Sequence, residues 1–328
     1  MASPRVLLVG AGAVGLVYGR HLQIGGADVH FYVRAKYARE TAEGFAMYNL
    51  NHSHKPVRFD GFGVHTQLEA VAQQAWDQVW LCISSTALAG DWLAPFLEAT
   101  GPATLISLQP GLFDQERLRD LVGVERLVTG LISFSSWHAP LPGESRPEPG
   151  FAYWHPPLAQ SRFDGPRASS IVASLKAGAC PAAAGGALSS STRGTAMLLP
   201  IIAAMEVGGW SFAGLRMPEQ LTIAAQAIQQ ASVISSQRIG LSPGPLKLVA
   251  RPLVIAGLSR LAPRIAPFDI ERFFQVHFTK VGAQTLQGLT DWITEGERIG
   301  LPTDAIATLR TSLIRVRGQS TTGSDSRG

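Results

Sequence analysis

Three glycines near the N-terminus have the spacing of a phosphate-binding turn. Gly10, Gly12 and Gly15 form a G-x-G-x-x-G pattern. One glycine makes the sharp turn, the next lets the backbone approach a pyrophosphate, and the third lets the following helix pack closely on its strand. The start of that helix, at Ala13 and Val14, offers free N–H groups and a partial positive charge to phosphate oxygens. The pattern predicts a dinucleotide-binding site.

Basic residues further along the chain indicate which dinucleotide is bound. Arg34 follows the second predicted strand, and Lys36 and Arg39 come soon after it. An acidic residue at this point would hold the ribose 2′-hydroxyl of NAD, whereas cations attract the 2′-phosphate of NADP. An arginine fork can bind such a phosphate through two hydrogen bonds. We therefore predict NADP(H) as the cofactor, with a solvated basic turn as the alternative.

Alternating strand and helix patterns position these groups. The apolar run at 6–9, the helix that ends at Gly25-Gly26 and the strand at 29–33 form a βαβ unit. Further strands are expected at 46–48, 64–65, 78–83, 104–108, 127–132 and 151–154, with helices at 68–75, 88–97, 114–121 and 171–177. This alternation predicts a Rossmann-type, doubly wound parallel α/β sheet. Ser84, Ser85 and Gln109 follow two of the strands, at the carboxyl edge where ligands bind, and are assigned to the cofactor site.

The second half of the chain has a different pattern. After a glycine- and serine-rich run at 182–191, helices are expected at 195–207, 218–238, 245–261, 270–299 and 303–317. We predict a Rossmann domain at 1–185, an all-helical domain for substrate binding and dimerisation at 186–317, and a disordered tail at 318–328. The substrate is expected to meet the cofactor in a cleft between the two domains.

Composition argues against several other classes of protein. The chain has 328 residues, of which 46% are hydrophobic and 16% charged, as in a well-buried globular protein. Its net charge of +4 is small, and the absence of a basic-aromatic patch argues against nucleic acid as a partner. The most apolar segment, at 196–215, contains Glu206, Pro200 and two adjacent glycines, which favours a core helix over a membrane span.

The two cysteines indicate a reducing compartment. Cys82 and Cys180 lie far apart, and neither belongs to a disulfide framework or to a spacing typical of metal ligands. We therefore expect no metal ion and a cytoplasmic location. The first strand begins almost at once, which leaves no room for a signal peptide.

With this organisation, the chain resembles the ketopantoate reductase (2-dehydropantoate 2-reductase) family. Its members are NADP-dependent enzymes with an N-terminal Rossmann domain and a helical C-terminal domain. The likeness covers nearly the whole chain and rests on VLLVGAGAVG, the arginine after the second strand, DQVWLCIS, SLQPG, LVTGLISF, LKAGA and GERIGLP, in that order. The resemblance implies hydride transfer from the cofactor to a small carbonyl or imine substrate. A homodimer is also expected.

The positions that carry catalysis in that family differ here, so the resemblance is to a divergent member. The family's catalytic lysine is replaced by Ser84, and its asparagine before glycine is replaced by Pro110. The family's general-acid lysine falls on or near Arg193, its helical asparagines near Met197 and Ile201, and its substrate-binding glutamate near Gly282. Arginine is a poor acid because its high pKa prevents it from giving up a proton. Apolar side chains in place of the asparagines indicate a less polar substrate.

One helix of the second half carries the other candidate groups. His277, Lys280 and Gln284 are spaced i, i+3 and i+7 within the predicted helix at 270–299, which stacks them on one face. Lys280 is the candidate proton donor, and His277 and Arg193 are further catalytic candidates. Gln284, Met197 and Glu206 are candidate substrate contacts. A plain amphipathic helix is the alternative for this segment.

Glu206 lies in an apolar segment, where a carboxylate needs a partner such as Arg193 or a functional role. Together these features predict an NADPH-dependent oxidoreductase that reduces a ketone or imine. Three alternatives stay open. They are a non-catalytic NADP(H)-binding sensor or scaffold, a genuine 2-dehydropantoate 2-reductase with a rearranged active site, and a dehydrogenase that works in the oxidative direction.

Overall fold

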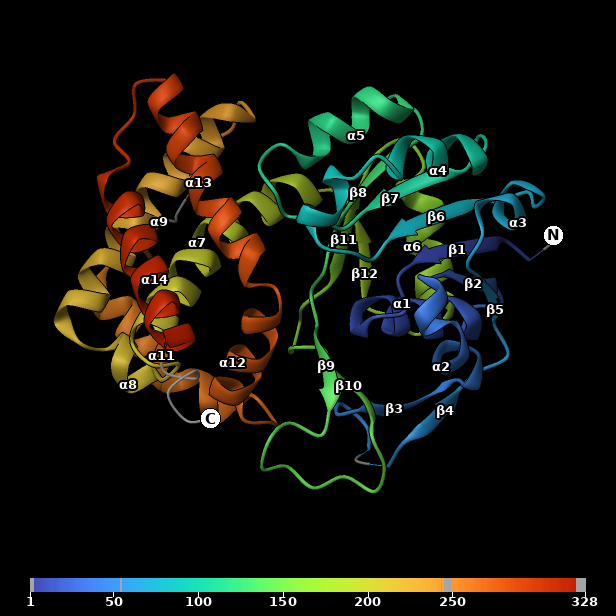
Figure 1. Cartoon of the computed structure of the whole chain (residues 1–328), viewed down its shortest axis with the longest axis horizontal. Helices are drawn as coiled ribbons and strands as arrows, with labels where there is room; N and C mark the ends of the chain where they lie inside the picture. The colour runs from blue at the N-terminus through green and yellow to red at the C-terminus, as the bar shows by residue number, and fades with distance from the viewer. Residues whose placement is uncertain (1–2, 54, 243, 245–248, 323–328) are drawn as a thin grey trace. The chain divides into compact units, whose positions relative to one another are not determined.

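The computed structural model describes residues 3–53, 55–242, 244 and 249–322. The chain divides into two compact units, Met1–Leu188 and Ser189–Gly328 (Figure 1). The first unit contains two β-sheets and the second is helical.

An eight-stranded sheet forms the centre of the first unit. Its order is β12-β11-β8-β7-β6-β1-β2-β5. The strands are β1 (Arg5–Val9), β2 (Asp28–Tyr32), β5 (Gly63–His65), β6 (Gln78–Leu81), β7 (Thr104–Ser107), β8 (Leu127–Leu131), β11 (Ser161–Asp164) and β12 (Ala182–Ala184). In this order, the neighbouring strands β8, β7, β6, β1, β2 and β5 all pair in parallel, whereas β11 runs antiparallel to β8. This parallel part has the strand order of a doubly wound Rossmann sheet, which confirms the predicted fold class.

Helices cover both faces of this sheet. On one face, α1 (Ala13–Ile24) and α6 (Ala168–Ala177) share a core with Val6 and Leu8 of β1. On the other face, α3 (Leu68–Ala72), α4 (Leu93–Ala99) and α5 (Asp114–Val122) pack around Leu7 and Val9. Successive side chains of a strand point to opposite faces, so a strand covered on both sides is apolar throughout. Each of these buried side chains contributes about 1.5–3 kcal/mol.

A smaller sheet extends the first of these cores. Its order is β4-β3-β10-β9, with β3 (Phe45–Asn49), β4 (Val57–Phe59), β9 (Ser135–Ala139) and β10 (Gly150–Trp154). Buried aromatic residues of β3 and β10 join the cluster that contains α1. Strands β3 and β10 were predicted from the sequence, whereas β4, β9, β11 and β12 were not. These strands have only three to five residues each, and segments such as SSWHA lack a clear apolar alternation.

Short helical segments follow the carboxyl ends of two strands of the main sheet. After β2 come η1 (Ala35–Tyr37) and α2 (Ala38–Glu43), and after β6 comes η2 (Ser85–Ala89). The predicted helix at 88–97 is therefore divided between η2 and α4. Gly90 separates the two, with an extended backbone.

The second unit is built on α9 (Pro218–Arg238), which packs against α11 (Pro252–Ile265), α13 (Gly282–Arg298) and α14 (Asp304–Thr322). Its other described helices are α7 (Ala187–Val207), α8 (Phe212–Leu215) and α12 (Ile270–Lys280). The bounds of α9 match the prediction, but α7 begins at Ala187 instead of residue 195. Part of the predicted helix at 245–261, namely 245–248, lies outside the described residues.

Two predictions for the second unit are wrong. The expected helix at 270–299 is interrupted at Val281, which separates α12 from α13. The expected tail at 318–328 is still helical as far as Thr322, because α14 continues past Gly318, and 323–328 lie outside the described residues. In the part of the chain that the structure describes, every helix is too short or too polar to cross a lipid bilayer.

Candidate cofactor site

The glycine-rich turn joins β1 to α1 at the switch point of the main sheet. Gly10 has a φ of +97°, which favours glycine, and a Cβ at Gly15 would lie 2.3 Å from the carbonyl oxygen of Gly10. The turn therefore requires glycine at both positions. A Cβ at the exposed Gly12 would meet nothing within 4 Å, so space remains beside the backbone for a ligand.

The N-terminus of α1 lies immediately beyond this turn. Gly12 is its N-cap and supplies no side chain, so the N–H groups of the first turn, which includes Ala13 and Val14, have no side-chain cap. The helix has 12 residues and no acidic side chain in its first turn. Uncapped N–H groups and the helix dipole together favour an anion such as a pyrophosphate.

The end of β2 presents an exposed cluster of two cations and one aromatic ring. Arg34 donates a hydrogen bond from Nη2 to the hydroxyl of Tyr37 at 3.2 Å, and its Cζ lies 5.1 Å from the centre of that ring. The Nζ of Lys36 lies 4.9 Å from the same ring. Arg39 instead pairs with Glu43 at 3.2 Å. Tyr37 was not predicted from the sequence, although an aromatic residue three positions after an arginine in a turn is a recognisable signal.

A buried polar network closes the carboxyl ends of β6 and β7. The side-chain amide of Gln109 donates from Nε2 to the carbonyl oxygens of Leu81 and Ile83, both at 2.8 Å. Its Oε1 accepts hydrogen bonds from Ser107 and from the N–H of Leu108. The Gln109 side chain was predicted to contact the cofactor, but it is only 3% exposed and its polar atoms are engaged within the protein. The amide instead satisfies the carbonyls of Leu81, the last residue of β6, and of Ile83, two positions later.

Asp114 has a similar role beside this network. Its Oδ2 accepts from Ser85 Oγ at 2.6 Å and from the N–H of Gly111 at 2.7 Å. Burial raises the pKa of the Asp114 carboxyl, while these two hydrogen bonds oppose that change. Ser85 was also assigned to the cofactor, yet its buried hydroxyl holds the start of α5. Ser84 is only half-buried, and its hydroxyl lies 2.8 Å from that of Thr86.

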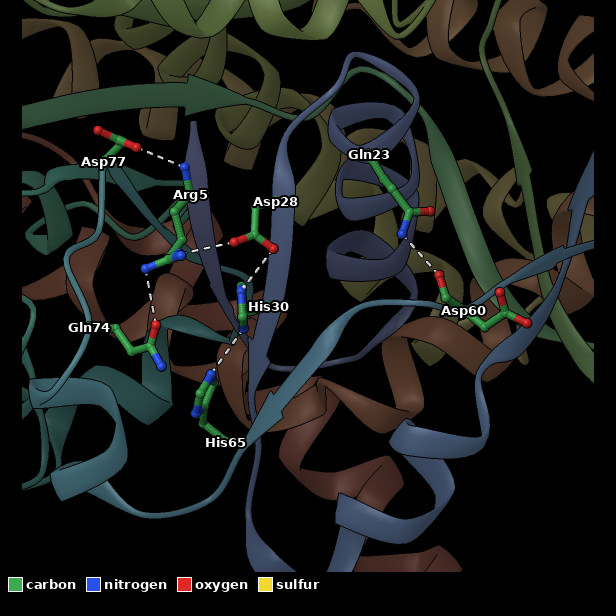
Figure 2. A network of polar contacts seen from close by, with 8 residues as sticks. All are labelled: Arg5, Gln23, Asp28, His30, Asp60, His65, Gln74 and Asp77. Carbon is green, nitrogen blue, oxygen red and sulfur yellow. Dashed lines mark hydrogen bonds and ion pairs between the residues drawn. The ribbon is translucent and has the colours of Figure 1, made fainter. Parts of the chain in front are cut away.

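A second polar cluster runs from Arg5, at the start of β1, to His65, at the end of β5 (Figure 2). Arg5 donates from Nε to Asp28, whose other oxygen lies 3.0 Å from Nε2 of His30. Nδ1 of His30 lies 3.0 Å from Nε2 of His65. The arginine hydrogen bond lowers the pKa of the Asp28 carboxyl, and burial lowers the pKa of His65. These contacts tie together the first residues of β1 and β2 and connect them to the end of β5.

The predicted polar stripe in the second unit is divided between two helices. His277 and Lys280 lie at the end of α12, whereas Gln284 lies in the first turn of α13. The prediction that these three residues share one face of a single helix is therefore wrong. The break falls next to Gly282, a poor helix former whose carbonyl accepts a hydrogen bond from Arg317 at 2.9 Å. A Cβ at Gly282 would lie 3.0 Å from that guanidinium group.

The two candidate catalytic side chains of α12 have different environments. Lys280 is exposed, so the partly desolvated amine that was predicted is not found. Burial against Phe273 and Phe278, and secondarily the charge of Lys280, lower the pKa of His277 to about 4. His277 is therefore uncharged at neutral pH and holds no proton that it readily gives to a substrate.

Glu206 has a different partner from the one expected. It is 8% exposed, and its two oxygens accept from Nε and Nη2 of Arg317 at 2.6 and 2.7 Å. Arg193 instead donates to the carbonyl of Ser242 at 3.3 Å. Since both oxygens of Glu206 are held in this bidentate pair, its assignment as a substrate contact loses its basis. Met197 is half-buried on α7.

The arrangement in the first unit defines a Rossmann-type nucleotide-binding fold. Residues 6–146 match the family model described as ketopantoate reductase PanE/ApbA, which confirms the resemblance found in the sequence. No curated protein sequence matches the chain.

Solved structures have the same fold over nearly the whole chain. One is a ternary structure of D-mandelate dehydrogenase with NADH and anilino(oxo)acetate, with a TM-score of 0.73, 13% identity, and coverage of 96% of this chain and 98% of that one. Another is a PanE/ApbA family ketopantoate reductase from Ralstonia eutropha JMP134, with a TM-score of 0.72, 17% identity and coverage of 97% and 99%. A third is a probable 2-dehydropantoate 2-reductase from Bacillus subtilis, with a TM-score of 0.66, 16% identity, and coverage of 95% of this chain and 99% of that one. The family and these structural relatives are oxidoreductases.

Proposed function

We propose that this protein is an NADP(H)-dependent oxidoreductase that transfers a hydride to the C=O or C=N bond of a small organic substrate. The observation that carries the proposal is the pairing of an uncapped glycine turn at β1–α1 with the exposed Arg34–Lys36–Tyr37 cluster after β2. The first accommodates a pyrophosphate. The second presents two cations where a doubly wound sheet holds the adenosine ribose.

The cofactor, when bound, supplies the hydride, and the residues of the chain orient it. Arg34 is held by the Tyr37 hydroxyl, which leaves the other guanidinium N–H groups to contact a 2′-phosphate. Gln109 and Asp114 fix the backbone at the ends of β6 and β7. These side chains therefore act as positioning residues.

Support for a carbonyl substrate comes from the structural relatives. The D-mandelate dehydrogenase structure is a ternary structure with NADH and anilino(oxo)acetate, and other relatives are 2-dehydropantoate 2-reductases. The apolar side chains of Met197 and Ile201 favour a less polar substrate than ketopantoate. Lys280 remains the proposed proton donor because, of the three catalytic candidates, His277 is uncharged at neutral pH and Arg193, as an arginine, retains its proton.

The cofactor choice is tested by titrating Arg34→Ala with NADPH and with NADH. Loss of charge-assisted hydrogen bonds to the 2′-phosphate is expected to weaken NADPH binding by about 1–3 kcal/mol and to leave NADH binding nearly unchanged. Arg39→Ala is the matched control, because Arg39 is an exposed cation of the same segment that pairs with Glu43. Equal losses for both cofactors in Arg34→Ala would refute the 2′-phosphate assignment.

A non-catalytic NADP(H)-binding protein is the second candidate. Ser84 and Pro110, which replace the lysine and asparagine of the related family, offer no group with a pKa suited to proton transfer at neutral pH. NADPH consumption with a panel of 2-oxo acids, ketones and imines separates the two functions. Tight NADPH binding without turnover on any of them would favour the sensor or scaffold.

We further propose a cytoplasmic homodimer that forms through α11. Val254, Leu258, Leu261 and Ile265 recur at heptad-like spacing along this helix and are 37–51% exposed. A stripe of this spacing on one copy fits the same stripe on a second copy. Light scattering on Leu258→Lys tests the proposal, since a charge in the seam is expected to yield monomers. An unchanged mass would reject α11 as the interface.

A further inference from the structure

Three potential metal ligands that are distant in sequence meet inside the first unit. They are His21 of α1, His155 just after β10, and Cys180 in the turn before β12. One donor atom from each lies within 4.8 Å of those of the other two. All three residues are buried, with 4%, 7% and 2% of their surface exposed. Because more than a hundred positions separate His21 from the other two, no spacing motif reveals the group.

The two histidines have ring nitrogens with no hydrogen-bond partner among the described residues. These atoms are Nε2 of His21 and both ring nitrogens of His155. Leaving a buried polar atom unsatisfied costs about 1–3 kcal/mol, so buried imidazoles are normally hydrogen-bonded. Two such rings that face a thiol indicate that something in this space accepts their lone pairs.

The other nitrogen of His21 has the partner that a metal-binding histidine requires. Its Nδ1 lies 2.7 Å from the carbonyl oxygen of Gly178 and must donate to it. This bond fixes the proton on Nδ1 and leaves the lone pair of Nε2 directed away from that carbonyl. Histidine ligands characteristically donate their second N–H to a carbonyl or carboxylate in this way.

The backbone around the other two ligands is also fixed. The Asn51 side chain accepts from the N–H of His155 and donates to its carbonyl, both at 2.8 Å. The backbone N–H of Cys180 donates a hydrogen bond to the carbonyl of Leu175 at 2.9 Å, and the N–H of Ala179 donates to the carbonyl of Lys176. This pair of bonds is the Schellman motif that ends α6 and places Cys180 directly after the helix.

We propose that His21, His155 and Cys180 form a binding site for one Zn²⁺ ion. Thiolate and imidazole ligands together suit zinc better than magnesium or calcium, which prefer oxygen ligands. Binding replaces the Cys180 thiol proton, which leaves to solvent, by a Zn–S bond. The three protein ligands leave one position of a tetrahedral ion for a non-protein ligand. The ion would link α1, the small sheet and the α6–β12 turn.

The site is separate from the cofactor groups in sequence and role. His21 lies in the C-terminal half of α1, whereas the phosphates are expected at its N-terminus. The inference therefore stands whether or not the protein binds NADP(H), and its test does not use enzyme activity.

The test measures metal content and cobalt spectra on the full-length protein. Purified protein is stripped with a chelator, dialysed against Zn²⁺ and analysed by atomic emission. One equivalent of Zn²⁺ per chain is expected, with a higher melting temperature than the stripped protein, because the ion binds the folded state. Co²⁺ in place of Zn²⁺ is expected to produce the near-ultraviolet charge-transfer absorption of a cobalt–thiolate bond.

Variants locate the bound ion. Cys180→Ala and His155→Phe are expected to lose the stoichiometric Zn²⁺, and Cys180→Ala the cobalt–thiolate absorption. Cys82→Ala and His138→Ala, which change a cysteine and a histidine outside the group, should keep one equivalent. If Cys180→Ala misfolds, the wild-type cobalt spectrum still decides the matter. A wild-type protein without that absorption, or a Cys180→Ala protein that keeps its Zn²⁺, would overturn the proposal.

Discussion

Replacing Glu206 by Gln tests whether this buried carboxylate is structural. The side chain keeps its shape but loses its charge. Of the two hydrogen bonds from Arg317, at 2.6 and 2.7 Å in the wild type, the amide oxygen can keep one, and the other is lost because the amide NH2 cannot accept. Breaking a fully buried ion pair costs about 3–5 kcal/mol. Arg317 has a side chain that is 25% exposed and keeps its bond to the carbonyl of Gly282. We therefore expect a smaller loss in the free energy of unfolding, about 2 kcal/mol.

Urea denaturation followed by tryptophan fluorescence measures this loss, since Trp210 and Trp292 both lie in the second unit. With a slope of about 2 kcal/mol per molar urea, the midpoint should fall by roughly 1 M. Glu297→Gln removes an exposed carboxylate of the same unit and should change stability by less than about 0.5 kcal/mol. An unchanged midpoint for Glu206→Gln, together with a higher KM, would refute the structural role and restore the assignment to substrate.

Three further predictions concern other parts of the chain. The hydrogen bond from Arg298, and then that from Arg238, lower the pKa of Glu295 to about 2. Because the folded pKa lies below the unfolded one, this stabilisation is complete above about pH 4.5 and is lost as pH falls toward 2, so Glu295→Gln should flatten the acid limb of a stability–pH curve. Gly15→Ala places a Cβ 2.3 Å from the Gly10 carbonyl and should lower both the melting temperature and NADPH affinity; wild-type values for both would contradict the tight turn. Lys280→Met should abolish turnover and keep NADPH affinity, and unchanged turnover would remove Lys280 as proton donor.

The amino-acid sequence was sufficient for the parts of the fold that depend on neighbouring residues. Steric rules within a few positions decide that Gly10 and Gly15 form a tight turn, and β1 is recognisable because both faces of it are buried. Local sequence features likewise predicted α9 with its observed bounds. The end of β2 places Arg34 where a nucleotide ribose is expected, and this too follows from local order.

Partner choice, in contrast, depended on tertiary structure. Glu206 pairs with Arg317 and not with Arg193, because the fold brings Arg317, near the end of α14, beside Glu206 of α7, although the two are 111 positions apart. Gln109 and Ser85 look like ligand contacts in the sequence, yet the carbonyls of β6 and the carboxylate of Asp114 engage them. Beside the break at Val281, Arg317 donates to the carbonyl of Gly282 and lies close to its Cα, a contact that the sequence does not reveal.

The sequence thus determined the βαβ turn, the parallel sheet and the helical second half, because hydrophobic periodicity and glycine sterics act over short distances along the chain. Only the tertiary structure decided which polar groups are satisfied and which are left over. His21, His155 and Cys180 illustrate the reason. A site made of side chains far apart in sequence has no spacing to read, and it forms only when packing brings α1, β10 and the α6–β12 turn together.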